Sequence, residues 1–250
     1  MTINLVHAIQ KVRDSVVAIL CIHAVPSKNA NEGEGNPGQF NCSFGSGFCV
    51  TADRYLVTAY HVLNNGKARD PKDRYFALTV PDNGAPAYHF PVMAFPIERP
   101  ELDLAVLEIG PCPTPGVHLP ALPVSFRPYP DGTPVVTVGY PSPEIASIEV
   151  DSQLNYLGGQ FFLKSHANEG IVAAQYDLDD HRMYELNVGW HHGESGGPIA
   201  SADSSPVAFS LMQHYRNVNS PHGVVAGPHR GFALGCMAEE LAALGIASED

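Results

Sequence analysis

The segment 192–198 reads His-Gly-Glu-Ser-Gly-Gly-Pro and holds one serine, Ser195, inside a turn of small residues. Glycine accepts backbone angles that other residues avoid, so Gly193 lets the turn present the Ser195 hydroxyl while the N–H groups of Gly193 and Ser195 converge beside it. Two such donors stabilise a carbonyl oxygen that gains negative charge by about 3 to 4 kcal/mol in a transition state. The segment also fits an ordinary Gly-rich turn, and a nucleophilic serine needs a base from elsewhere in the chain.

The composition favours an all-β chain. The 250 residues include 22 prolines and 23 glycines, and 44% of the residues are hydrophobic. Turn-forming residues spread along the whole length favour many short strands over long helices. We expect a short helix over residues 3–13, a short helical turn over residues 60–63, and a helix over residues 237–244 that ends at Gly245.

The charge and the cysteines restrict the class of partner and the compartment. The net charge is −12 and the 14 lysines and arginines are scattered, so no basic stripe is present to bind nucleic acid or an anionic membrane. Five cysteines, an odd number without a repeated spacing, do not indicate a disulfide framework. Without a clear leader peptide or an apolar run of about 20 residues, the sequence predicts a cytoplasmic protein.

The apolar pattern divides residues 1–250, taken as a single unit, into two β-rich halves. We expect a first barrel over 14–110, a proline-rich linker over 111–123, a second barrel over 124–236 and a final helix over 237–245. A polar segment over 26–43 is predicted to be a loop. The predicted strands are 15–25, 44–52, 55–59, 75–80, 88–95, 101–109, 131–141, 147–156, 160–164, 170–175, 183–188, 199 onward, 207–215 and 231–235.

Two residues in the first half suit the chemistry that Ser195 requires. His61 follows a predicted strand, and Asp103 interrupts the apolar run 101–109. An imidazole accepts the proton of an attacking serine, and a carboxylate fixes the tautomer of that imidazole and stabilises its cation. A single histidine is more often a surface or core residue, whereas a carboxylate in an apolar strand requires a hydrogen-bonded partner.

Five segments in chain order resemble the chymotrypsin-like serine endopeptidases, and in detail the bacterial HtrA (Deg) proteases. They are 46–48 (Ser-Gly-Phe), 57–62 (Val-Thr-Ala-Tyr-His-Val), 103–107 (Asp-Leu-Ala-Val-Leu), 132–141 (Gly-Thr-Pro-Val-Val-Thr-Val-Gly-Tyr-Pro) and 193–198 (Gly-Glu-Ser-Gly-Gly-Pro). The resemblance implies two six-stranded antiparallel β-barrels with an active site between them. It also implies His61 as the general base, Asp103 as its orienting carboxylate, Ser195 as the nucleophile, and the amides of Gly193 and Ser195 as the oxyanion hole.

Three features depart from these families. Val62 follows His61, where animal trypsins have a cysteine. The chain lacks an Ile-Val-Gly-Gly start, so Glu194 has no newly cleaved amino terminus to pair with, and we expect no zymogen cleavage. No PDZ domain follows the protease unit, so recruitment of substrates as in HtrA proteases is not expected.

The position of Ser195 suggests which residues form the specificity pocket. We expect Gly189 and Trp190 at its base and the segment 209–211, Phe209-Ser210-Leu211, with the strand near Gly231, as its walls. No acidic residue falls at the base, so a small or medium apolar side chain is the expected residue before the cleaved bond. An alternative is that His191, His192 or His214 binds an acidic or amide side chain. Ser210 is also a candidate for a hydrogen bond to Asp103.

We expect no metal and no cofactor. Neither the pair His191-His192 nor the residues His222 and His229 have the spacing of a zinc site.

The leading hypothesis is a serine endopeptidase that cleaves proteins or peptides through an acyl-enzyme on Ser195. The alternative is an inactive pseudoprotease that serves as a binding module, which the complete set of residues disfavours. An esterase with a Gly-x-Ser-x-Gly elbow is disfavoured because its histidine would follow the serine in the chain. The segments 26–43, 140–153 and 216–230 are expected to border the cleft as mobile stretches, so an activating protein partner is a further hypothesis; no oligomeric state is predicted.

Overall fold

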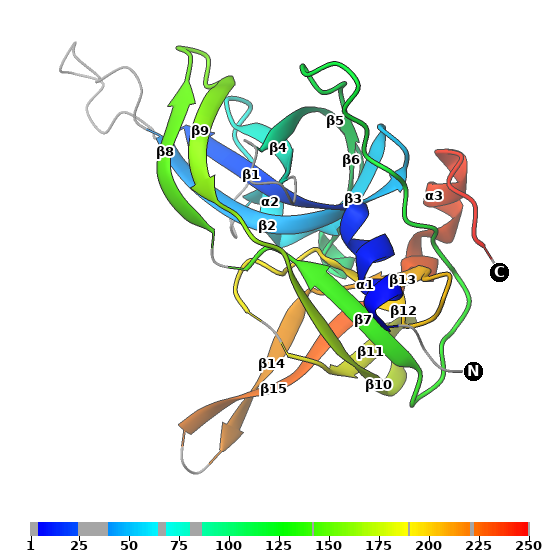
Figure 1. Ribbon diagram of the computed structural model, residues 1–250. Helices are drawn as coiled ribbons and strands as arrows, with labels where there is room; N and C mark the ends of the chain where they lie inside the picture. The colour runs from blue at the N-terminus through cyan, green and yellow to red at the C-terminus, as the bar shows by residue number, and fades with distance from the viewer. Residues whose placement is uncertain are drawn as a thin grey trace.

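The computed structural model (Figure 1) describes residues 5–24, 40–64, 69–80, 87–141, 143–189, 191–220 and 223–249. Strands dominate these residues, as the composition predicts. The two short helices expected at the ends are confirmed as α1, Leu5–Asp14, and α3, Ala238–Ala243, which is preceded by a 3₁₀ turn at Leu234–Met237.

The first half is a closed six-stranded barrel, as expected. Its strands follow the order β1-β2-β3-β6-β5-β4, and β1 pairs with β4 to close it. The bounds are β1 Val16–Ala24, β2 Phe40–Thr51, β3 Tyr55–Ala59, β4 Arg74–Thr79, β5 Tyr88–Arg99 and β6 Leu104–Ile109. A one-turn helix, α2, spans Tyr60–Asn64 directly after β3.

The side chains of β1 and β6 are buried on both faces, so these two strands of the barrel wall are covered both inside and outside the barrel. In β1 the seven residues from Val16 to Ile22 are all buried, and β6 is buried except for Glu108. Continuous apolar runs of this kind suit strands covered on both faces. The predicted loop 26–43 ends earlier than expected, because β2 begins at Phe40 and pairs with Ala24 of β1; residues 25–39 lie outside the described part.

The second half differs from the expected six strands. It is a curved seven-stranded sheet in the order β13-β12-β7-β10-β11-β15-β14. Ser210 in β13 forms a single β-bridge with Ala233, which directly follows β15, so the β13 edge of the sheet approaches the end of β15. Strand β14 pairs with β15 and forms the other edge of the sheet. The bounds are β7 Pro134–Gly139, β10 His166–Leu178, β11 His181–Asn187, β12 Pro198–Ser201, β13 Ala208–Leu211, β14 His214–Ser220 and β15 Gly223–Phe232.

Two of the predicted mobile stretches form hairpins instead. Glu144–Val150 is β8 and Tyr156–Phe162 is β9, which together make a separate two-stranded ribbon. The strand predicted over 147–156 is confirmed for 147–150, which belong to β8, and is wrong beyond that point. There Asp151 forms a turn, in which its carboxylate accepts hydrogen bonds from the N–H groups of Gln153 and Asn155. The third stretch, 216–230, lies mostly in the hairpin of β14 and β15.

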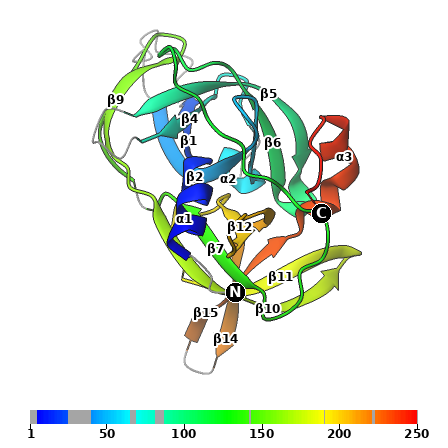
Figure 2. The ribbon, with the colours of Figure 1, turned by 45° about the vertical axis from the view of Figure 1, so that its right-hand side comes forward.

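The helices and the connecting segment join the two halves. Helix α1 packs against β7 (Figure 2), and Arg99 at the end of β5 forms an ion pair with Glu240 of α3. Between β6 and β7 the chain contains no strand, apart from bridges of Val124 to Ala208 and Ser248. The double-barrel chymotrypsin-like fold is therefore confirmed.

Candidate active site

Ser195 lies in a tight turn between β11 and β12. Gly193 and Gly196 in this turn have φ angles of 100° and 88°, in the region that favours glycine. Among the described residues, the amide N–H groups of Gly193 and Ser195 have no hydrogen-bond acceptor. The turn therefore offers two unpaired donors beside the Ser195 side chain, which is what stabilisation of an oxyanion requires.

Ser46 of the first barrel holds this turn in place. Its N–H donates to the carbonyl oxygen of Ser195 at 2.7 Å, and its hydroxyl donates to the carbonyl oxygen of Gly193 at 2.7 Å. The same hydroxyl accepts a hydrogen bond of 2.9 Å from the N–H of Tyr140, which follows β7. Ser46 is fully buried, so these three bonds form away from water. Ser46 belongs to a segment that carries the family resemblance, but no sequence pattern indicated this role for it.

The glycines after Ser195 are required by close approach of the backbone. A Cβ atom on Gly196 would lie 2.1 Å from the carbonyl oxygen of Ser46 and 2.4 Å from Thr58 Oγ1. A Cβ atom on Gly197 would lie 2.4 Å from the carbonyl oxygen of Val138. The hypothetical Gly196 Cβ would also lie 3.0 Å from the N of Ala59, two residues before His61. The turn of Ser195 therefore lies against the chain that leads into His61.

His61 and Asp103 form a two-point contact. The His61 N–H donates to Asp103 Oδ1 at 2.8 Å, and His61 Nδ1 lies 2.7 Å from Asp103 Oδ2. The Asp103 side chain is 10% exposed and that of His61 is 38% exposed. When Nδ1 carries the proton that the carboxylate accepts, Nε2 is left as a proton acceptor.

Asp103 does not lie in the strand where the sequence predicted it. It follows a 3₁₀ turn over Pro100–Leu102, has a φ of 50°, and immediately precedes β6. Aspartate tolerates this left-handed conformation better than most residues. The turn directs the carboxylate to the start of α2, and the carbonyl oxygen of Asp103 accepts a hydrogen bond from the N–H of Tyr60.

Gln213 supports this turn, and the proposed hydrogen bond from Ser210 is wrong. Ser210 Oγ donates to the carbonyl oxygen of Phe232 at 2.7 Å. Gln213 Nε2 instead donates to the carbonyl oxygens of Leu102 and Asp103 at 2.6 and 2.8 Å, and its Oε1 accepts from the N–H of Phe232 at 2.7 Å. A glutamine two residues after the apolar strand β13 is the signal that could have identified it.

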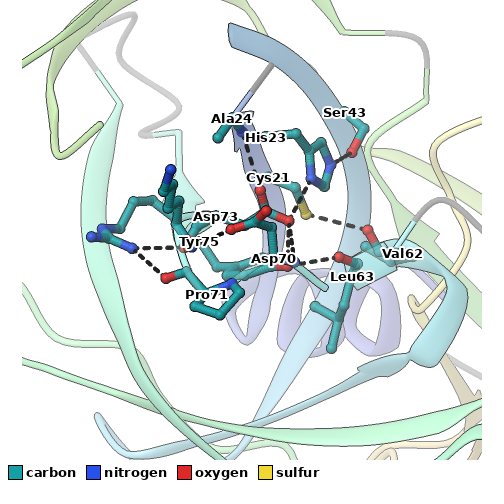
Figure 3. Close-up of polar contacts among 12 residues, drawn as sticks. Cys21, His23, Ala24, Ser43, Val62, Leu63, Asp70, Pro71, Asp73 and Tyr75 are labelled. Atoms are coloured by element: carbon teal, nitrogen blue, oxygen red, sulfur yellow. Dashed lines mark hydrogen bonds and ion pairs between the residues drawn. The ribbon is translucent and has the colours of Figure 1, made fainter. Parts of the chain in front are cut away.

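A second polar cluster lies under the carbonyl end of α2 (Figure 3). Cys21 Sγ donates to the carbonyl oxygen of Val62 at 3.2 Å, and the Tyr75 hydroxyl donates to that of Leu63 at 2.9 Å. A five-residue helix leaves such carbonyl groups without partners in the helix. These two bonds therefore fix the short helix on which His61 lies.

His23 completes this second cluster. Its Nδ1 lies 3.2 Å from Asp73 Oδ2 and its Nε2 lies 3.0 Å from Ser43 Oγ. Asp73 also accepts hydrogen bonds from the N–H groups of Ala24 and Asp70. The cluster thus links the end of β1, β2 and the segment before β4, and it lacks the glycine turn that gives Ser195 two free amide donors.

Glu194 finds its partners within the second half. Its Oε2 accepts from the His191 N–H at 2.9 Å and its Oε1 accepts from Asn168 Nδ2 at 3.2 Å. Burial raises the pKa of Glu194, and the hydrogen bonds from His191 and Asn168 lower it in part. The Glu194 carboxylate therefore has hydrogen-bond partners without a newly cleaved amino terminus.

The residues expected to form the specificity pocket are only partly brought together. Gly189 is exposed and lines a cavity of about 760 Å³ near Leu5 and Ile171, and Ser195 is not among the residues that line it. Phe209 is buried and stacks on Tyr129 with 4.1 Å between ring centroids. Ser210 and Leu211 are also buried, and Trp190 lies outside the described residues. The pocket roles of all five stay predictions.

The histidines weighed for specificity and for metal binding are only partly described. Within the described residues no three His, Cys, Asp or Glu side chains lie together as potential metal ligands. The His191 ring contacts the His166 ring edge to face, with 6.2 Å between centroids. His222 and the side chain of His214 lie outside the description.

Among the helices described, none is long and apolar enough to span a membrane.

Comparison with known proteins shows that the chain is similar to peptidases in sequence and fold. A family model for the trypsin-like peptidase domain matches residues 45–208. The HtrA-type protease AlgW with a decapeptide is similar over 97% of this chain and 68% of its own, with a TM-score of 0.62 and 15% identity. AlgW with a tripeptide is similar over 98% of this chain and 65% of its own, with a TM-score of 0.60 and 16% identity. Among curated proteins, none matches.

Proposed function

Because this chain belongs to the trypsin-like peptidase domain family, we propose that it is a serine endopeptidase in which Ser195 is the nucleophile. The observation that carries the proposal is the two-point contact of His61 with Asp103, beside a turn whose Gly193 and Ser195 amides have no acceptor among the described residues. Base, orienting carboxylate and oxyanion donors are the groups that activation of a serine requires.

The reaction follows from these roles. Ser195 Oγ attacks the carbonyl carbon of the substrate while His61 Nε2 takes the hydroxyl proton, and the N–H groups of Gly193 and Ser195 bind the oxyanion. Asp103 stabilises the imidazolium. Collapse of the tetrahedral intermediate breaks the C–N bond, and His61 donates its proton to the leaving amine. A water molecule, deprotonated by His61, then hydrolyses the acyl-enzyme and restores Ser195.

For the substrate, we propose proteins or peptides with a small or medium apolar residue before the cleaved bond. The similar AlgW structures hold a decapeptide and a tripeptide. Glu194, the acidic residue closest to Ser195 in the chain, already accepts hydrogen bonds from His191 and Asn168. It is therefore not available to bind a basic side chain.

The proposal includes two statements about control. Glu194 has its partners within the second half, which supports an enzyme that needs no zymogen cleavage. A protein partner that orders loops near the cleft is the proposed regulator. All five cysteines are free, which supports a reducing compartment for the enzyme.

Cleavage of a peptide library, read by mass spectrometry, tests this function. We expect the native chain to cleave after Ala, Val or Leu, and Ser195→Ala to leave the library intact. Cleavage after acidic residues would support the histidine alternative for specificity. Equal product from the native chain and from Ser195→Ala would contradict the proposed mechanism.

A further inference from the structure

A second cavity, of about 730 Å³, lies away from the candidate active site. It is lined by the end of α1, the ends of β4 and β9, the segment 116–119 and the connection from β9 to β10. Neither His61, Asp103 nor Ser195 is among its lining residues. A volume of this size suits a small organic molecule.

Arg13 lines this cavity and has an unsatisfied donor. Its Nε atom is buried and has no hydrogen-bond partner, the one such side-chain atom among the described residues. Within the same residues no ion pair involves Arg13. A buried N–H of a charged group without an acceptor is unfavourable, and native structures supply a partner in the great majority of cases. The Nε atom is itself closed off from the cavity, so a ligand there would meet the Nη groups of Arg13, for which no ion pair is present among the described residues.

Lys164 provides a second cation to the cavity from the connection between β9 and β10. It is exposed, and no ion pair within the described part of the chain involves it. Some other cations among the described residues are paired, as Arg69 is with Glu98 and Arg182 with Asp177. Asp14 is the one carboxylate of the lining, and it has an interaction of its own. The lining thus holds two cations for one carboxylate.

The remaining lining suits a flat apolar group. Tyr88 and Tyr140 contribute aromatic rings, and Val80, Val117 and Leu163 contribute aliphatic surface. His118 also lines the cavity, and its Nδ1 lies 2.7 Å from Asp53 Oδ2. Aromatic rings of this kind stack on other flat groups.

We propose that this cavity binds a small organic phosphate, with the phosphate on Arg13 and Lys164 and an aromatic body against Tyr88 and Tyr140. A guanidinium presents its N–H groups in a planar fork that matches phosphate oxygens, and a lysine adds a point charge. A nucleotide and a simpler aryl phosphate share this chemistry.

Tyr140 connects the cavity to the turn of Ser195. Its N–H donates to Ser46 Oγ at 2.9 Å, and Ser46 Oγ donates to the carbonyl oxygen of Gly193 at 2.7 Å. Occupancy of the cavity is therefore expected to change the reactivity of Ser195. This expectation rests on the proposed function, whereas phosphate binding does not.

Isothermal titration of the full chain with phenyl phosphate, adenosine monophosphate, inorganic phosphate and benzoate tests the binding. We expect both organic phosphates to bind, with the tighter of the two indicating the source, and inorganic phosphate and benzoate to bind at least tenfold more weakly. Arg13→Gln and the exposed variant Lys164→Gln are each expected to weaken binding at least tenfold. Lys11→Gln, a cation removed from the same helix, is the matched control and is expected to bind as the native chain does.

Absence of binding to the native chain, or equal weakening by Lys11→Gln and Arg13→Gln, would overturn the site. The coupling is measured separately, as the rate at which a fluorophosphonate labels Ser195 with and without phenyl phosphate. An unchanged rate at saturating phenyl phosphate would overturn the coupling alone. A chain that binds phenyl phosphate but is never labelled would contradict the proposed function and leave the phosphate site standing.

Discussion

The hydroxyl of Ser46 in the first barrel donates a 2.7 Å hydrogen bond to the carbonyl oxygen of Gly193 in the second half. The N–H of the same residue holds the carbonyl oxygen of Ser195. One residue of β2 therefore fixes the peptide group that precedes Glu194 and the one that follows Ser195. Since His61 and Asp103 belong to the first barrel, Ser46 also sets where the Ser195 turn lies relative to them.

Ser46→Ala is expected to lower kcat/KM by about 10- to 100-fold, because the Gly193 carbonyl and the Tyr140 N–H both lose a buried partner. Each unpartnered group destabilises the fold by about 1 to 3 kcal/mol. Steady-state kinetics and urea denaturation measure the two effects. Ser147→Ala, on the exposed strand β8, is the control, and equal kinetics for both variants would show that Ser46 does not hold the turn.

Gly196→Ala is expected to destabilise the chain by about 3 kcal/mol or more, because its Cβ would lie 2.1 Å from the backbone oxygen of Ser46. Gly245→Ala is the matched control. Gly245 also has a positive φ, of 78°, but no atom lies within 4 Å of its Cβ position. The control therefore isolates the backbone strain, about 1 to 2 kcal/mol. Similar urea midpoints for the two variants would show that the turn around Ser195 does not pack tightly against β2.

Gln213→Leu is expected to reduce kcat and stability together. The substitution leaves the carbonyl oxygens of Leu102 and Asp103 and the N–H of Phe232 without their partner. We expect a loss of about 2 to 4 kcal/mol in the free energy of unfolding. Gln160→Leu, at an exposed position of β9, provides the comparison. If Gln213→Leu keeps the kcat of the native chain, Gln213 does not help to position Asp103.

Asp103→Asn is expected to lower kcat by about 10⁴-fold, because the amide cannot hold the His61 tautomer and stabilise its cation as the carboxylate does. The fold should persist, since asparagine keeps the shape of aspartate and tolerates its left-handed φ of 50°. Peptide hydrolysis and circular dichroism measure the two outcomes, with Asp131→Asn on the exposed turn before β7 as the control. A kcat within tenfold of the native value would exclude the proposed role of Asp103.

Glu194 is expected to make stability depend on pH. Its pKa is raised by burial, so between the unfolded and folded pKa values the folded state holds a proton that the unfolded state has released. The stability that this group contributes is present below its unfolded pKa and decreases as the pH rises through that window. The Tm of the native chain, minus that of Glu194→Gln, should fall from pH 4 upward. A difference that rises with pH would show that hydrogen bonds outweigh burial at Glu194.

The sequence predicted the first barrel well because its strands are long and apolar. The residues from Val16 to Ile22 can be covered only in a buried strand, and the Asp53-Arg54 turn identifies the hairpin of β2 and β3. The second half was harder to predict. Its strands β8, β9 and β10 are largely exposed or only partly buried, so little apolar periodicity identified their ends.

For the candidate site, motifs identified His61, Asp103 and Ser195. No motif near Ser46 or Gln213 indicated that these two residues support the site. Ser46 and Gln213 act through partners far away in the chain, Gly193 and Asp103 respectively, and such pairs are visible only in three dimensions. The left-handed turn at Asp103 was missed because the apolar run 104–109 after it looked continuous with the preceding residues.

Labelling of the purified chain with a fluorophosphonate probe, read by intact mass, tests the role of Ser195 most directly. We expect one adduct on the native chain, mapped to Ser195 by peptide analysis, and none on Ser195→Ala or His61→Ala. Ser43→Ala should label as the native chain does, because Ser43 lies outside the glycine turn although it contacts His23. An adduct that persists in Ser195→Ala, or that disappears in Ser43→Ala, would contradict Ser195 as the nucleophile.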